Sequence, residues 1–479
     1  MDKRILRTEL KLLLRDRGVL VLLAAFACVL VYGFYNGAAW VGGRSAEIRQ
    51  IVEKHENFLA ERRSEVETGF TGSNEPGNFV ANPSDPFTIG TELHYAVLPF
   101  SPGAIFAVGQ SDVLPTQHGI SLLTLQRTKA DKAGFENPMS LMYGKFDAAF
   151  VIIFLLPLVI LAMSFDLISA ERESNTLAML LSEPISLWSL LVSKIAARAI
   201  FVAVPILIGL IVAATLSGTA AMTGEFWWRA GIWLIVVAAY AAFWFGLAAA
   251  INSFSRRSAT NAVASAALWL LFVLVLPSLI GIIVSGVFPV PSRTEVTAAI
   301  RGVNLDMRRD GEKLLTEYYQ DHPELLPKDG KTDLKAFGLA FVYIQQQHKA
   351  KIAEVESRFT DQLEKQRKWV SLSRFLSPAI AANEATLDVA GTGTTRFVDF
   401  RTQAGEHDRA WNEYFRGKVF RLEKLTAGDF DSLPRFSHKE EPFAEVIGRV
   451  LTGTGFILIA TIALFFIAYR GTRKYGAQK

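Results

Sequence analysis

The sequence predicts an all-α protein with six membrane-crossing helices and a helical domain outside the bilayer. Of its 479 residues, 51% are hydrophobic, and the mean hydropathy is +0.26, which is too apolar for one soluble domain. Yet 20% of the residues are charged and must be placed in water. Apolar runs alternate with long polar segments, and most of those segments repeat apolar residues at helical spacing, so spans joined by helical insertions satisfy all three observations.

About 20 apolar residues are needed to cross a hydrocarbon core as an α-helix. Six charge-free stretches reach that length, bounded by Arg17 and Arg44, Asp147 and Asp166, Arg198 and Glu225, Arg229 and Arg256, Arg257 and Arg293, and Arg449 and Arg470. The first stretch follows basic residues, as in a signal peptide, but it has no small-residue cleavage pattern and is predicted to be a span. Prolines are predicted to kink spans two, three and five at Pro157, Pro205 and Pro277.

The distribution of Lys and Arg predicts the orientation of these spans, since basic residues favour short cytoplasmic segments. Basic residues gather before span one, between spans four and five, and after span six. We therefore expect a multi-pass protein of the bacterial inner membrane with both termini in the cytoplasm. The predicted divisions are 1–43 (N-terminus and span one), 44–146 (first periplasmic insertion), 147–292 (spans two to five, with cytoplasmic segment 166–194), 293–447 (second periplasmic insertion) and 448–479 (span six and C-terminus).

The first insertion is predicted to begin as a helical continuation of span one, with Ile51, His55, Phe58 and Arg62 on one stripe. Gly, Asn and Pro cluster between residues 69 and 86, so the helix should end there.

The second insertion is predicted to contain an antiparallel helical hairpin. Its apolar residues recur at steps of three and four on both sides of a turn at residues 321–331, as Val296, Ile300, Val303, Met307, Leu314 and Tyr318, and then Phe337, Phe341, Ile344, His348, Ile352, Val355, Phe359 and Leu363. Residues 377–401 are predicted to form a loop and residues 406–425 a last helix. The insertions leave from spans one, two, five and six, and they should pack as one unit.

Several classes of function are excluded or disfavoured. A net charge of +4 gives no case for nucleic acid, and the single cysteine, Cys28, allows neither an intrachain disulfide nor a Cys-based zinc site. All seven histidines fall in the insertions, and none stands three to five residues from another, so no metal site is predicted. They are His55, His94, His118, His322, His348, His407 and His438.

The chain is predicted not to be an enzyme and to hold no cofactor. It lacks a phosphate-binding loop, because Leu325 stands where the first glycine would precede Gly330-Lys331-Thr332, and it lacks zinc-protease and nucleophile-elbow motifs. The span centres carry no Asp, Glu, Lys or Arg, so a proton-coupled carrier is disfavoured. Energy is expected from a separate ATPase subunit. Tyr32, Tyr35 and Asn36 in span one are candidates for a substrate path, and packing or an interfacial position explains them equally well.

The polar segment between spans two and three carries the clearest functional signal. Its acidic and basic residues, Asp166, Glu171, Arg172 and Glu173, crowd the end of span two. A short helical pattern then opens at Thr176 and Leu177 and closes at Pro184. Such a segment can lie along the membrane surface, or it can be an ordinary charged loop.

The stretch FDLISAERESNTLAMLLSEPISLWSLLVSK resembles the segment after span two of the ABC-2-type permeases, the six-span membrane subunits of ATP-driven exporters. Two further stretches, residues 95–115 and 374–400, are similar to a subgroup with large external insertions and unknown function. That subgroup is distantly akin to gliding-motility and nitrous-oxide-reductase-maturation permeases. The insertions exceed those of simple family exporters.

The resemblance implies that the acidic-Arg-acidic cluster and the helix after it dock into an ATPase subunit that binds ATP and Mg. It implies a dimer of ATPases with a second permease copy or a paralogue. A periplasmic or outer-membrane protein is a further possible partner. The main alternative is an ATP-driven mechanical or assembly role without a transported substrate. A ligand sensor and a stand-alone carrier are weaker rivals, because the cytoplasmic parts contain no signalling module and the spans contain no carboxylate.

Overall fold

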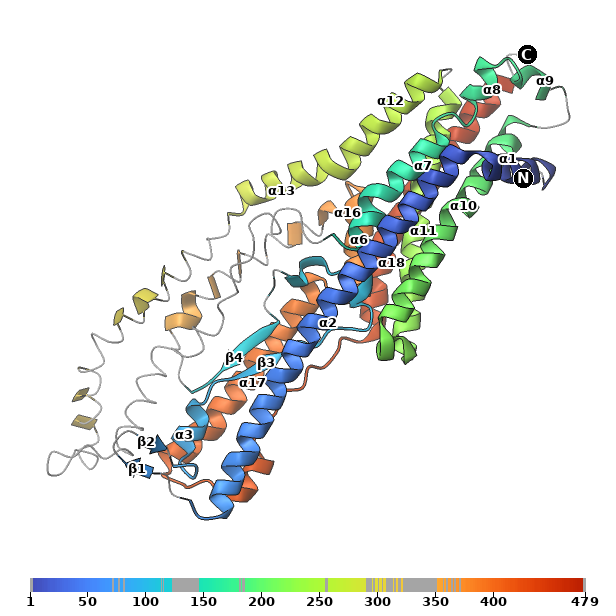
Figure 1. Cartoon of the computed structure of the whole chain (residues 1–479). Coiled ribbons are helices and arrows are strands. Elements are labelled where there is room, and N and C mark those ends of the chain that lie inside the picture. The colour runs from blue at the N-terminus through green and yellow to red at the C-terminus, as the bar shows by residue number, and fades with distance from the viewer. Residues whose placement is uncertain are drawn as a thin grey trace.

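The computed structural model describes residues 3–70, 73–75, 78–80, 82–112, 114, 116–122, 146–180, 182, 186–254, 257–289 and 372–476, with short pieces between 295 and 369. Within these residues, six helical segments are long and apolar enough to cross a membrane, as predicted. They are Arg17–Glu67, Ala148–Glu173, Leu187–Leu216, Gly224–Phe254, Ser258–Val287 and Phe443–Arg473. Figure 1 shows them bundled toward the end that holds both termini, with a second domain at the other end.

Helix α2 (Arg17–Glu67) joins the two parts of the molecule. Its 51 residues correspond to about 76 Å at 1.5 Å per residue. The Asp16 side chain accepts hydrogen bonds from the amides of Gly18 and Val19 and so separates α2 from a short preceding helix, α1 (Lys3–Arg15). As predicted, the helix of span one continues into the insertion and ends just before Gly69.

The remaining spans follow in order. Span two comprises α6 (Ala148–Phe150), the π-helical segment η3 (Val151–Leu155) and α7 (Leu156–Ser164). The short helices α8 (Ser169–Glu173) and α9 (Leu177–Leu180) lead to α10 (Leu187–Leu216), η4 (Gly218–Met222) and α11 (Gly224–Phe254). Span five comprises α12 (Ser258–Trp269), the π-helical segment η5 (Leu270–Val275) and α13 (Leu276–Val287), and span six is α18 (Phe443–Gly476).

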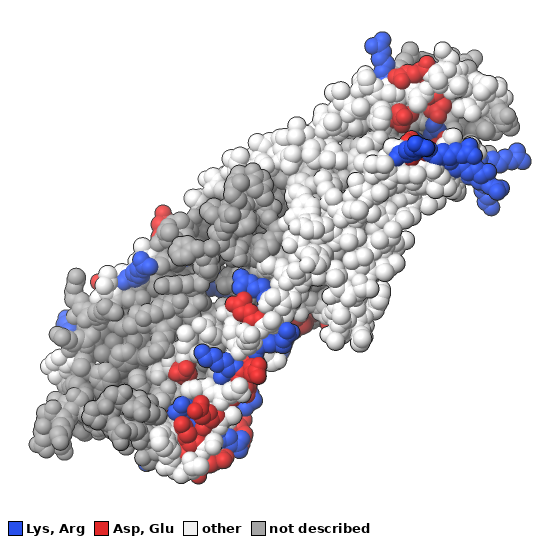
Figure 2. Space-filling model, in the orientation of Figure 1, with Lys and Arg blue, Asp and Glu red and all other residues white. Residues whose placement is uncertain are grey.

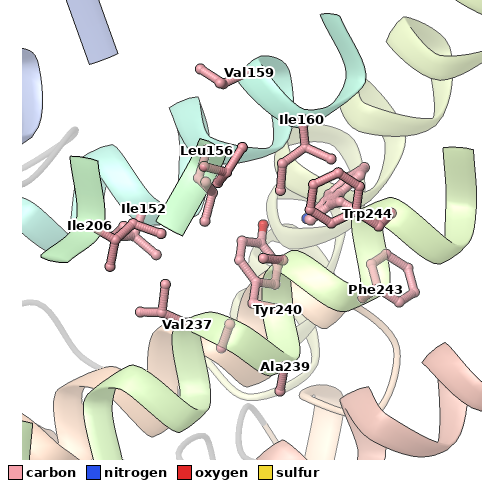
Figure 3. Packing of buried hydrophobic residues seen from close by; sticks show 14 of the residues in the cluster. Ile152, Leu156, Val159, Ile160, Ile206, Val237, Ala239, Tyr240, Phe243 and Trp244 are labelled. Carbon is pink, nitrogen blue, oxygen red and sulfur yellow. The ribbon is translucent and has the colours of Figure 1, made fainter. Parts of the chain in front are cut away.

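Two of the span prolines, Pro157 and Pro277, are the second residues of the helices that follow these π-helical segments, whereas Pro205 lies inside the continuous helix α10. A proline cannot donate to the carbonyl four residues earlier, so that carbonyl needs another donor. For Pro157 the carbonyl belongs to Ile153, and it accepts a 2.9 Å hydrogen bond from the Tyr240 hydroxyl of span four. In Figure 3, Tyr240 points from α11 toward α7.

Helix α11 forms the centre of the membrane bundle, packed against α18, α16 and α7. Trp233, Tyr240 and Trp244 are fully buried along it. Burial of such large aromatic side chains is a major source of packing energy inside the bundle. The surrounding spans expose apolar side chains on their outer faces, as lipid requires.

The second domain combines both insertions around one core. Its first part contributes α3 (Pro86–Thr91), η1 (Ala104–Phe106), η2 (Gly109–Asp112) and two antiparallel two-stranded sheets. These sheets pair β1 (Ser73–Glu75) with β2 (Asn78–Val80) and β3 (His94–Val97) with β4 (Gln117–Ile120). Its second part contributes α17 (Thr394–Phe420) and η7 (Ala427–Asp431). Leu59, Ile89 and Ile120 pack in one cluster with Trp411 and Phe415, so the described parts of the two insertions pack as one unit.

The loop predicted for residues 377–401 is wrong. That region forms α16 (Pro378–Ala390) and the start of α17, separated by a turn at Gly391 in the left-handed conformation (φ 70°). The Ser377 side chain caps α16, and Pro378 occupies its first turn. The last helix, predicted for 406–425, therefore runs from Thr394 to Phe420. The hairpin seam predicted from Phe337 to Leu363 lies largely outside the described residues.

Helix α16 reaches the middle of span five. The Ser377 hydroxyl donates a 2.6 Å hydrogen bond to the carbonyl of Phe272, which lies in η5. From there α16 packs along α11 and α18. At its other end, the Arg229 guanidinium of span four donates to the carbonyl of Val389 at 2.6 Å. The second insertion is thus wedged between the spans as well as seated above them.

Candidate functional site

Charged side chains meet at the end of the bundle that carries both termini. There α1, α8, α9 and the start of α10 lie together (Figure 1). Figure 2 shows Lys, Arg, Asp and Glu side chains gathered at this end, and a broad surface without charges between it and the second domain. The predicted segment 166–194 is therefore placed at the edge of the apolar belt.

Helix α1 is an amphipathic helix that the sequence analysis did not separate from the basic residues before span one. Leu13 is buried, and Ile5, Leu6 and Leu10 are partly buried against the bundle, where α1 packs on α10. Its basic side chains are exposed. The signal was present in the sequence as apolar residues at helical spacing, followed by a capping aspartate.

A buried ionic cluster links α1, α8 and α10. The Lys194 ammonium of α10 bonds to the Glu171 carboxylate of α8 and lies 3.8 Å from Glu9 of α1. Arg198, one turn further along α10, lies 3.6 Å from Glu9 and 4.0 Å from Asp166. The side chains of Lys194 and Arg198 are only 6% and 10% exposed. Charges at such burial need each other, so the cluster holds the three elements in one arrangement.

The second carboxylate of the acidic-Arg-acidic cluster faces span five. Glu173 accepts hydrogen bonds from the backbone amide and the hydroxyl of Ser258, at 2.7 and 3.0 Å. Ser258 is the first residue of α12, where free amides and the helix dipole favour a negative charge. Glu173 thus ties α8 to the beginning of span five.

Two buried asparagines hold the joint between α7 and α8. The Asn252 side-chain amide of span four donates to the carbonyl of Ser164 at 3.0 Å, and its oxygen accepts from the amide of Ile168 at 3.3 Å. The Asn261 side chain of span five donates to the carbonyl of Phe165 at 2.9 Å. These asparagines were missed by the sequence analysis because a single amide near a span end has no recognisable pattern.

Helix α8 and the segment that follows it, as far as α9, form a compact end of the bundle that we call the tip. The Thr176 amide donates to the carbonyl of Glu171 at 3.0 Å, and Leu177 is buried. Asn175 adopts a positive φ of 59°, and Met179 of α9 is 67% exposed. Arg172 is half-buried, and Pro184 lies outside the described residues.

A groove of about 380 Å³ opens between α1, α8, α9 and α10. Its apolar lining comes from Ile5, Leu12, Met179, Leu180 and Leu190. Its charged lining comes from Arg4, Glu9, Glu171 and Lys194. An apolar floor with a few placed charges is suited to receiving a protein segment.

The residues proposed for a substrate path do not join this site. Tyr32 and Tyr35 are 56% and 59% exposed on α2, and Tyr32 lies against Phe146 with ring centroids 5.8 Å apart. Asn36 donates a 2.6 Å hydrogen bond to the carbonyl of Phe146. Asn36 therefore anchors the start of span two to span one, while the tyrosines remain open to lipid or to another chain.

Two family models match the chain. Residues 113–229 match a family described as ABC-2 family transporter protein, and residues 293–439 match a domain of unknown function, DUF3526. The first match contains spans two and three and the segment between them, including Glu171, Glu173 and Lys194. The second coincides with most of the second insertion. No curated protein matches the sequence.

Proposed function

We propose that this ABC-2-type permease subunit is driven by a separate ATPase that binds the tip and groove formed by α8, α9 and α1. The buried ionic cluster of Glu171, Lys194 and Glu9 carries this proposal, because it fixes the tip to span three. Glu173 fixes the same tip to span five. A push on α8 and α9 would therefore move several spans at once, which a free charged loop would not do.

The proposal divides the predicted coupling residues into two roles. Glu171, Glu173 and Asp166 act as internal anchors, since their carboxylates face partners within the chain. The contact with the ATPase is made by the exposed part of the tip, above all Met179, and by the groove beside it. Arg172, Thr176 and Leu177 lie in the tip between these two groups, and Pro184 remains a predicted coupling residue.

ATP and Mg are bound by the ATPase dimer, and the permease works as a dimer with a second copy or a paralogue. The chain itself has no phosphate-binding loop in its sequence. We place it in the bacterial inner membrane with both termini in the cytoplasm, which puts the tip on the side where ATP is available. Tyr32 and Tyr35 remain candidates for the substrate path.

Co-purification tests the coupling surface. The chain is purified from its native membrane in mild detergent, and the accompanying proteins are identified by mass spectrometry. We expect a soluble ATPase with a phosphate-binding loop at about equal amount. Met179→Glu should reduce its recovery at least tenfold, which corresponds to about 1.4 kcal/mol of binding free energy.

Met222→Glu is the matched control, because Met222 is 86% exposed in η4 at the other end of span three. It should leave ATPase recovery unchanged. Recovery of no ATPase by the unaltered chain would refute the permease role. Equal recovery with both variants would refute the assignment of the tip.

One observation favours a mechanical role for the external part. Helix α2 continues without a break from span one into the second domain. Movement of span one would therefore be passed to the insertions as a rigid displacement, with or without a transported molecule. Vesicles that contain the permease and its ATPase separate the two functions, because ATP-dependent uptake of a substrate is expected only of an exporter.

A further inference from the structure

Three histidine rings are packed together where the layers of the second domain meet. His55 lies on α2, His94 on β3 and His407 on α17. The rings of His55 and His94 are nearly parallel, with centroids 4.5 Å apart, and the rings of His94 and His407 are 6.1 Å apart. Residues from both insertions therefore bring three imidazoles, distant in the sequence, into one cluster.

His94 is the centre of this cluster and is poorly placed to carry a charge. It is 4% exposed, and Trp411 covers it at a centroid distance of 4.1 Å. Among the described residues, the one hydrogen-bonding contact of its ring is with the backbone of Glu92, and neither ring nitrogen meets a side-chain partner. A buried imidazole in such surroundings is stable as a neutral, apolar ring and costly as a cation.

The carboxylates around the cluster offset only part of the cost of protonation, since Glu56 and Asp408 raise the pKa of His55 and His407 by less than burial lowers it. Glu56 follows His55 on α2 but is engaged by Arg435, at 3.2 Å, from the segment after η7. On α17, Asp408 follows His407 and accepts a hydrogen bond from Asn412. Glu92 precedes His94 in the chain, and on β4 His118 lies opposite Ala96. After Trp411, the rings nearest to His94 are thus two more imidazoles.

We propose that His55, His94 and His407 form an acid-sensing joint, in which proton uptake separates α17 from α2 and β3. Neutral rings stack and keep the joint closed. Charged rings repel one another and require water, which only an open joint supplies. Because α2 continues into span one, opening at this point changes what the second domain transmits to the membrane. The placement of this joint outside the cell rests on the proposed function. The acid response of the joint does not depend on that function.

The direction of the pH effect follows from the pKa values. Burial, and after it the neighbouring His55 and His407, lower the pKa of His94 to about 3, although the backbone contact with Glu92 raises it. Burial also lowers the pKa of His55 and of His407. In the open form the pKa returns toward its usual value near 6.5. The closed form therefore keeps its full stability above that pH and loses it as the pH falls toward 3.

Distance measurements on the full chain test this joint without any partner. Spin labels are placed at Lys54→Cys on α2 and Arg409→Cys on α17, both exposed positions, in a Cys28→Ser background within lipid nanodiscs. Between pH 8 and pH 4, a longer-distance population should grow. The equilibrium constant between the closed and the open form should rise about tenfold per pH unit below the usual histidine pKa for each proton taken up.

His94→Phe keeps an aromatic ring but cannot titrate, so it should abolish the growth of the longer-distance population. His55→Phe, which replaces the less buried ring, should reduce this growth. It takes the place of His94→Phe in the test if His94→Phe does not fold. His118→Phe removes an imidazole from the same sheet and should leave the response intact.

A distance distribution that does not change with pH in the unaltered chain would overturn the proposal, as would equal loss of response in His94→Phe and His118→Phe. The response must also persist in a chelator, since its disappearance would assign the cluster to a metal ion. Because no ATPase is present, this experiment can fail while the permease role stands. Equally, the permease role can be refuted while the joint still responds to acid.

Discussion

Lys194 lies between two carboxylates, Glu171 and Glu9, with 6% of its side chain exposed. Lys194→Met keeps the apolar stem but leaves Glu171 without its cation, whereas Glu9 keeps Arg198 at 3.6 Å. Removing one partner of a buried ionic cluster typically costs roughly 3–5 kcal/mol, because the remaining charge stays buried. We therefore expect a clear fall in the thermal unfolding temperature in detergent and loss of ATPase stimulation.

A surface ion pair provides the control for Lys194→Met. Arg63 and Asp431 lie 2.7 Å apart in the second domain, with side chains 42% and 62% exposed. Water screens such exposed pairs, so they contribute little, and Arg63→Met should change the unfolding temperature little. If the two variants behave alike, the cluster at Lys194 does not hold the tip. Adding Glu171→Gln to Lys194→Met should recover part of the loss, since it removes the unpaired charge.

At this scale the sequence drew attention to individual charged residues but did not predict their partners within the chain. Glu171 and Glu173 were singled out from a local pattern, and both lie at the tip. Their partners, Lys194 and Ser258, are 23 and 85 residues away, and Glu9 belongs to another helix. A pairing across such separations depends on how helices pack, and periodicity within one segment does not contain that information.

Helix α7 shows how an element can tolerate a residue that its own backbone disfavours. Pro157 cannot donate a hydrogen bond to the carbonyl of Ile153, and the fully buried Tyr240 donates its hydroxyl hydrogen to that carbonyl instead. Tyr240→Phe should destabilise the bundle by about 1–3 kcal/mol, the cost of a buried polar group without a partner. Thermal unfolding in detergent measures it.

The double variant makes this prediction specific. In Pro157→Ala the new amide can bond to the carbonyl of Ile153 within the helix, so the same Tyr240→Phe change should then cost much less. The difference is a coupling energy, expected at about 0.5–3 kcal/mol for groups in contact. Equal costs of Tyr240→Phe in both backgrounds would show that its hydroxyl does not serve that carbonyl.

The elements that the sequence analysis missed, α1 and α16, share a physical reason. Each is 13 residues long and is stabilised mainly by packing against spans. The Ala-rich sequence of α16 has little amphipathic contrast because it is buried among α11 and α18. Its end signals, Ser377 with Pro378 and then Gly391, were readable, but the Gly- and Thr-rich turn after it led to the loop prediction.

On the scale of the whole molecule, the six spans and the shared domain of the insertions followed from composition and periodicity. Long apolar runs leave no other solution, because every backbone polar group in a bilayer must be bonded internally. The wedge made by α16 and the histidine joint did not follow. Both require the two insertions and the spans to meet in three dimensions, at contacts such as Ser377 with Phe272 or His55 with His94.

The two ends of the molecule should face opposite sides of the membrane, which a membrane-impermeant maleimide measures on spheroplasts carrying Cys28→Ser. Lys11→Cys and Ser182→Cys lie at the end with the tip, and Met222→Cys and Arg409→Cys lie beyond the apolar belt, all at exposed positions. Because basic residues favour the cytoplasm, the second pair should react in intact spheroplasts and the first pair only after lysis. The reverse pattern would show the opposite orientation, in which the tip lies on the side of the membrane without ATP. Reaction of all four positions from outside would contradict the membrane crossing between α1 and η4.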